Sequence, residues 1–74
     1  MDKISIYPIG SFVKLNKGDI AKVVSSNSSS PLRPVVLVLL DSYGNHIQKP
    51  KALDLSKDGS IYIKKPVLLK EDKN

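Results

Sequence analysis

The amino-acid sequence predicts an all-β fold, a small SH3-like barrel of five to six short antiparallel strands. Short apolar segments recur along the chain, and turn-forming residues separate them at intervals of roughly ten residues. No stretch shows a long helical period. A chain of 74 residues makes one domain at most, and closing a barrel is the economical way to remove exposed strand edges at this size.

The clearest strand is the run of six aliphatic residues from Val35 to Leu40. Pro34 before it and the turn residues after it leave too little room for a helix. A run so rich in β-branched residues is typical of a central strand that is largely covered on both faces. Alternation then gives an inward face of Val36, Val38 and Leu40, and an outward face of Val35, Leu37 and Leu39.

A β-hairpin is predicted earlier in the chain, from residues 12–15 and 20–25. Val13 and Leu15 alternate with polar or larger neighbours and are expected to point inward. The intervening Asn-Lys-Gly-Asp sequence indicates a bulged turn with Gly18 in the left-handed region. Ala21 and Val23 share one face of the returning strand.

The second half of the chain carries weaker signals. Gly44 is the expected positive-φ residue of a second turn. Further expectations are a mobile polar loop at 26–31, a return pairing at 46–48, a short strand or one helical turn at 52–55, and a strand at 61–63 that ends before Lys64. The predicted domain boundaries are a leader or edge strand at 1–6, a single β-barrel at 7–66 and a tail at 67–74.

The amino-acid composition excludes several kinds of site. The chain has no Cys, which excludes disulfides and thiolate metal sites and fits a reducing compartment. No apolar run approaches the roughly 20 residues of a membrane span. We therefore expect a cytoplasmic module.

Catalytic motifs are absent from the sequence. The single His, His46, stands beside a turn in no recognisable motif, and the aspartates sit mainly in turns, where Asp is common. The four glycines are spaced one to a turn rather than gathered in a phosphate-binding loop. We expect no catalytic, cofactor-binding or metal-binding residue, and we expect that the chain is not an enzyme.

The positive charge has two interpretations. The net charge is +5, but its lysines are scattered from Lys3 to Lys73, which favours a solvated surface. The alternative is nucleic-acid binding, with Lys14 and Lys22 across one hairpin from each other and Phe12 nearby.

Arg33 is the chain's single arginine. Flanking prolines hold its backbone stiffly, which suits a salt bridge to Asp41 or Asp54 at least as well as capture of an anion.

Four segments in a fixed order resemble a known family. They are residues 7–16 (Tyr-Pro-Ile-Gly-Ser-Phe-Val-Lys-Leu-Asn), residues 18–24 (Gly-Asp-Ile-Ala-Lys-Val-Val), Asn27, and residues 31–36 (Pro-Leu-Arg-Pro-Val-Val). Together they resemble the C-terminal β-domain that follows the catalytic domain in bacterial HD-GYP proteins. The match covers residues 7–41, and 53–63 more loosely.

The resemblance implies a non-catalytic accessory module. HD-GYP proteins are metal-dependent phosphodiesterases that hydrolyse cyclic di-GMP, so the parent protein is implied to be such an enzyme. This chain has no His-Asp dipeptide and no Gly-Tyr-Pro triplet, so no catalytic or metal-binding residue carries over. The implied partner is an HD-type catalytic domain, in cis or in trans.

Docking on that domain is the first hypothesis for function. Leu37 departs from the family pattern, which has a charged or polar residue there, and makes the outer face more apolar. The predicted docking residues are Phe12, Val35, Leu37 and Leu39. The alternative is RNA or DNA binding in the manner of KOW or Tudor-like domains through Lys14, Lys22 and Arg33; direct cyclic di-GMP binding ranks last, because it calls for more than one Arg.

Overall fold

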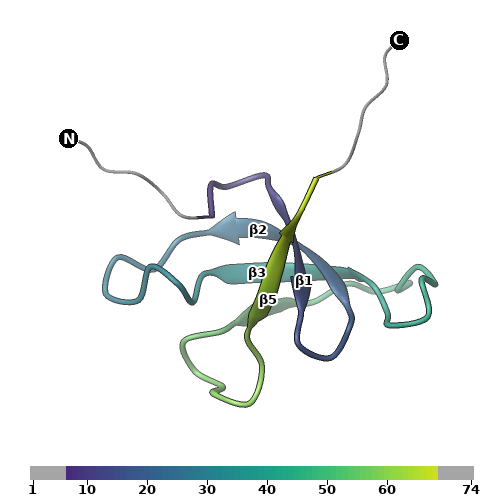
Figure 1. Cartoon of the computed structure of the whole chain (residues 1–74). Coiled ribbons are helices and arrows are strands. Elements are labelled where there is room, and N and C mark those ends of the chain that lie inside the picture. Colours follow the sequence, from purple (N-terminus) through teal and green to yellow (C-terminus); the bar gives the residue numbers. More distant parts are fainter. Residues whose placement is uncertain (1–6, 69–74) are drawn as a thin grey trace, which may run out of the picture.

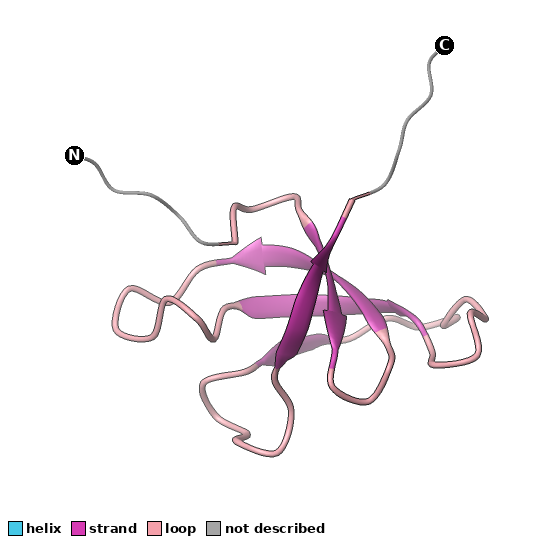
Figure 2. Cartoon of the chain, in the orientation of Figure 1, coloured by secondary structure: helices cyan, strands magenta, loops and turns pink. Residues whose placement is uncertain are grey.

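The computed structural model describes residues 7–68, and these form a single antiparallel sheet of five strands with no helix (Figures 1 and 2). The strands are β1 (Phe12–Leu15), β2 (Ile20–Ser25), β3 (Val35–Leu40), β4 (Ala52–Asp54) and β5 (Ile63–Val67). Their order in the sheet is β4-β3-β2-β1-β5, so the last strand pairs with the first. The predicted all-β fold is confirmed, and β5 runs steeply across the direction of β2 and β3, as expected of a strongly curved, barrel-like sheet (Figure 1).

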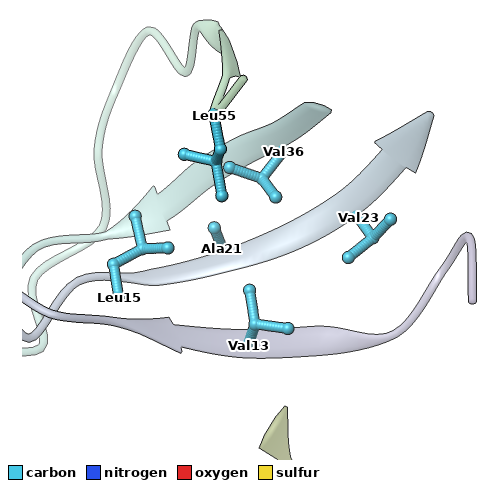
Figure 3. Close-up of a cluster of buried hydrophobic side chains, with 6 residues drawn as sticks. All are labelled: Val13, Leu15, Ala21, Val23, Val36 and Leu55. Atoms are coloured by element: carbon cyan, nitrogen blue, oxygen red, sulfur yellow. The ribbon is translucent and has the colours of Figure 1, made fainter. Parts of the chain in front are cut away.

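The buried core lies on the inner face of this sheet. Val13 and Leu15 in β1 and Ala21 and Val23 in β2 are at most 1% exposed, as their alternation predicts. The buried hydrophobic core cluster is completed by Val36 from β3 and Leu55 from the turn after β4. Leu55 lies close to Val36 and above Ala21, so a turn residue closes the core (Figure 3).

A β-bulge changes the face assignment at the end of β3. Ile20 pairs with Leu40, while the next residue, Ala21, pairs with Val38, so Leu39 is the extra residue. Leu40 therefore shares the face of Ile20, not that of Val36, and the prediction that Leu40 points inward is wrong. The physical reason is that one inserted residue moves every later side chain to the opposite face. Val36 and Val38 do face the core.

The last strand lies later than predicted. The sequence indicates a strand at residues 61–63, whereas β5 begins at Ile63 and continues through Lys64, Lys65 and Pro66 to Val67. Pro66 is tolerated because β5 is an edge strand, where a missing N–H leaves no ladder partner unsatisfied.

Two of the turns contain a glycine with positive φ, as the sequence predicts. Gly18 has φ +99° and Gly44 has φ +85°, the left-handed region predicted for both. At Gly18 a Cβ would also lie 3.0 Å from the Cβ of Ser42. Residues 46–48 contribute one bridge, between His46 and Leu40. The predicted leader at 1–6 and the last six residues of the predicted tail lie outside the described residues.

Asn16 holds the start of β5 against the β1–β2 turn. Its backbone N–H donates to the Tyr62 carbonyl at 2.8 Å, and its side-chain Oδ1 accepts from the Tyr62 N–H at 2.9 Å. Its Nδ2 donates to the Ser60 carbonyl at 3.1 Å. Three hydrogen bonds from one residue thus fix where β5 joins the sheet.

None of the residues 7–68 belongs to a helix long and apolar enough to cross a membrane.

Replacing Leu55 with Ala tests the role of this side chain in closing the core. Leu55 is fully buried, so Leu55→Ala is expected to lower the free energy of unfolding by about 2–5 kcal/mol, through lost burial and a residual cavity. The measurement is urea unfolding followed by circular dichroism. Leu68→Ala, at a position 92% exposed, serves as the control and should change stability by less than about 0.5 kcal/mol. Equal effects of the two substitutions would contradict the packing described.

Candidate functional site

An apolar groove lies on the outer face of the sheet. It encloses about 390 Å³ and is lined by Phe12, Ile20, Leu39 and Leu40 from three strands and by His46, Ile47 and Pro50 from the loop after β3. The loop is held in place because the Ile47 N–H donates to the Leu39 carbonyl at 2.9 Å. The structure therefore brings together Phe12 and Leu39, two of the four residues predicted for docking.

Val35 and Leu37, the other two predicted docking residues, lie outside this groove. Leu37 pairs with Lys22, which in turn pairs with Phe12, so the three form one row across β3, β2 and β1. Val35 lies at the other end of β3, opposite Ser25 and Asp54. Leu37 thus extends the apolar face beside the groove, whereas Val35 lies away from it.

Sequence reasoning missed the remaining groove residues. Leu40 reaches the groove because the bulge at Leu39 places it on the outer face, opposite Ile20. Ile47 belongs to the return pairing predicted at 46–48, which the structure shows as the His46–Leu40 bridge and the Ile47–Leu39 hydrogen bond, and Pro50 follows it in the loop. A clue was available at Ile20, whose alternation with Ala21 already assigns it to the outer face.

The register of the sheet sets how the lysines of β1, β2 and β5 lie relative to one another. Lys14 pairs with Ile20 on one side and with Lys65 on the other, while Lys22 pairs with Phe12. Lys14 and Lys22 lie across the hairpin from each other as diagonal neighbours on one face, because the turn fixes Lys14 opposite Ile20. Phe12 is directly across from Lys22. Like charges directly opposite each other, as in Lys14 and Lys65, oppose strand pairing.

Arg33 has a structural position apart from these lysines. Its Nη1 donates to the carbonyl of Leu55 at 3.1 Å and to that of Ile61 at 3.3 Å. Both partners are neutral carbonyl oxygens, so the structure does not show the salt bridge predicted with Asp41 or Asp54. The Asp41 carboxylate instead accepts from the backbone N–H groups of its own turn.

Asp54 lies at the centre of a polar cluster beside Arg33. Its Oδ1 accepts from the Ser56 hydroxyl at 2.6 Å, from the Ser56 N–H at 3.0 Å and from Asn27 Nδ2 at 3.0 Å. The Ser56 hydrogen bonds, followed by that from Asn27, lower the pKa of Asp54 below its ordinary value of 3.8. Asn27 Nδ2 also donates to the Arg33 carbonyl at 2.5 Å, so this cluster ties the polar loop to β4.

Asp58 repeats the same arrangement one turn later. Its Oδ1 accepts from the hydroxyl of Ser60 at 2.6 Å and from the Ser60 N–H at 3.0 Å, and these bonds lower the pKa of Asp58. Both carboxylates therefore stabilise turns, the role that Asp commonly has.

No group of three or more His, Cys, Asp or Glu side chains that could hold a metal ion occurs among residues 7–68. His46 is exposed beside its turn.

Residues 12–74 match the family model described as a KOW domain associated with an HD domain. Neither the curated proteins nor the solved structures include a significant match.

The pKa of Asp54 gives a test of the polar cluster. In Ser56→Ala the largest cause of the shift is gone, so the pKa of Asp54 is expected to rise toward 3.8. A carboxyl whose pKa is lowered by folding stabilises the fold above pH 3.8, and this contribution is lost as the pH falls through the folded-state value. The variant should therefore lose less stability than the wild type on acidification below pH 3.8.

An NMR pH titration of the Asp54 carboxyl carbon, with urea unfolding at each pH, makes the measurement. Ser60→Ala is the matched control, because it removes the equivalent donor to Asp58 and should leave the pKa of Asp54 in place. An unchanged Asp54 pKa in Ser56→Ala would rule out the proposed cause.

Proposed function

The chain belongs to the family of KOW domains associated with an HD domain, and from this premise we propose that it docks on that HD domain through its outer apolar groove. As a member of this family, it is an accessory module of HD-domain proteins rather than a catalytic domain. The proposal adds the surface used and the way in which the two domains meet.

The groove is the observation that supports docking. Its lining comes from three strands and a loop that hydrogen bonds to β3, so it is formed before any partner arrives. Phe12 is its aromatic residue, and a buried aromatic is the usual anchor of a protein interface. Leu37 extends the apolar surface toward β4. Apolar side chains in a concave site of a small domain are best explained by a partner that covers them.

The lysines beside the groove indicate what kind of partner surface would fit it. Lys22 is opposite Phe12 and Lys14 is on the same face, so the groove has a basic border. A partner surface with an apolar side chain at its centre and carboxylates around it would fit this border and associate faster at low salt. We further propose that the partner is a cyclic di-GMP phosphodiesterase domain of the HD-GYP type, in cis or in trans, in the cytoplasm of a bacterium; the ordered segments between residues 7 and 41 support this.

An NMR titration with the HD domain of the same organism tests docking. Amide shifts are expected at Phe12, Ile20, Leu39 and Ile47, and extending to Leu37. Phe12→Ala should weaken binding by about tenfold or more, as loss of an interface anchor does. Leu32→Ala is the control, because Leu32 is 60% exposed and does not line the groove. The absence of shifts at Phe12, Ile20, Leu39 and Ile47 at high partner concentration would dispose of the docking proposal.

Binding of RNA or DNA is a second candidate function, and the pairing of Lys14 with Lys65 favours it. Like charges on residues directly opposite each other weaken strand pairing, and a bound anion would offset this repulsion. Lys22 adds a third cation on the same face, next to Phe12. A sugar–phosphate backbone lying along β1 would neutralise these charges and place a base against the Phe12 ring.

The nucleic-acid candidate predicts a steep salt dependence. Binding of a single-stranded oligonucleotide, measured by fluorescence anisotropy at several salt concentrations, should weaken as salt rises. The slope of log K against log salt should fall by about 0.7 for each phosphate that a variant no longer neutralises. Lys14→Gln and Lys65→Gln are expected to reduce the slope, whereas Lys57→Gln, in the turn after β4, should not. Lack of binding at low salt would remove this candidate and leave the docking proposal standing.

A further inference from the structure

A second hollow lies where the start of the described chain, the segment before β3 and the start of β5 meet. It encloses about 260 Å³ and is lined by Tyr7, Leu32, Arg33, Tyr62 and Ile63. It shares no lining residue with the apolar groove, and neither candidate function above uses its aromatic residues. Two of the three tyrosines of the chain line it.

The guanidinium of Arg33 is held in one orientation at this hollow. Its Nη1 is fixed by the carbonyls of Leu55 and Ile61, and its main chain is fixed by the hydrogen bond from Asn27. A guanidinium carries five N–H donors in a planar fork. Within residues 7–68, the hydrogen bonds of this guanidinium all come from Nη1, so the Nε and Nη2 edge remains to donate to an anionic or carbonyl oxygen of a ligand.

The charge of Arg33 is only weakly balanced by its surroundings. Its hydrogen-bond partners are neutral carbonyls. Its charge lowers the pKa of Asp58, but less than the hydrogen bonds from Ser60 do. A partly buried cation with neutral partners favours binding of an anion.

The apolar walls suit a planar ring. Tyr62 is 49% exposed and Leu32 is 60% exposed, although both line a concavity. Asn16 hydrogen bonds to both the N–H and the carbonyl of Tyr62, so the backbone that carries the Tyr62 ring is firmly positioned. An aromatic face beside a guanidinium is the combination that binds nucleobases by stacking.

From this geometry we propose that the hollow binds a single nucleotide. The base lies against Tyr62 and Leu32, and the guanidinium of Arg33 donates to the phosphate. At about 260 Å³ the hollow is slightly below the common range of about 300–1,000 Å³ for ligand pockets, which suits one base rather than two. The nucleotide can be free or a unit of a single-stranded chain, because both present the same base and phosphate.

A titration with the four ribonucleoside 5′-monophosphates tests the site in the full chain. Saturable NMR shifts are expected at Leu32, Arg33, Tyr62 and Ile63, together with quenching of tyrosine fluorescence, which is informative because the chain has no Trp. Inorganic phosphate and the free nucleosides should each bind more weakly than the monophosphates. A trinucleotide in place of the monophosphate distinguishes the two sources: tighter binding at the same residues indicates a strand, and equal binding indicates a free nucleotide.

Tyr62→Ala is the decisive variant, and Tyr43→Ala is its matched control. Both tyrosines are exposed, but Tyr43 is 88% exposed at the turn after β3 and does not line the hollow. Tyr62→Ala should weaken nucleotide binding at least fivefold with unchanged unfolding by urea, and Tyr43→Ala should leave binding unchanged. Failure of every monophosphate to shift these residues at about 10 mM would overturn the proposal, as would shifts confined to Lys14, Lys22 and Lys65.

Discussion

The interaction on which the rest of the structure depends is the pair of hydrogen bonds from Arg33 to the carbonyls of Leu55 and Ile61. These carbonyls stand at the two ends of the segment that joins β4 to β5, so one guanidinium holds that segment against the start of β3. The Leu55 N–H adds a bond of 3.2 Å to the Pro34 carbonyl. Leu55 is thereby kept in the core above Ala21, in a sheet whose edge strands β4 and β5 are not paired with each other. The Arg33 side chain and Leu55 thus close the core, as direct pairing of the two edge strands would in a closed barrel.

This arrangement separates two surfaces with different chemistry. The outer face of β1, β2 and β3 carries an apolar groove beside two lysines, which suits a protein surface with carboxylates around an apolar centre. The hollow at Arg33 carries two tyrosines and a guanidinium, which suit a planar anion. Because the two share no lining residue, an accessory domain of this size has room to hold a partner domain and a small ligand at once.

The β-bulge at Leu39 is what makes the groove apolar. Without the extra residue, Leu40 would continue the inner face of β3, and the outer face would lose one of its leucines next to Ile20. Bulges are over-represented at sheet edges, at barrel rims and next to functional sites, where they redirect a side chain. Under the docking proposal, the HD domain associated with this family is the occupant of this redirected surface.

The sequence by itself determined the all-β class, the inward positions of β1 and β2, and the glycines of two turns. These features follow from period-2 alternation and from positive φ at Gly18 and Gly44, which are local properties of the chain. It also predicted Phe12 and Leu39 as docking residues, and the structure places both in one groove. Only the tertiary structure decided the face of Leu40, the pairing of Lys14 with Lys65 and the carbonyl partners of Arg33. Each of these depends on register or contact between segments far apart in the chain, and a one-residue bulge or an edge strand shifted by two residues leaves no mark on local periodicity.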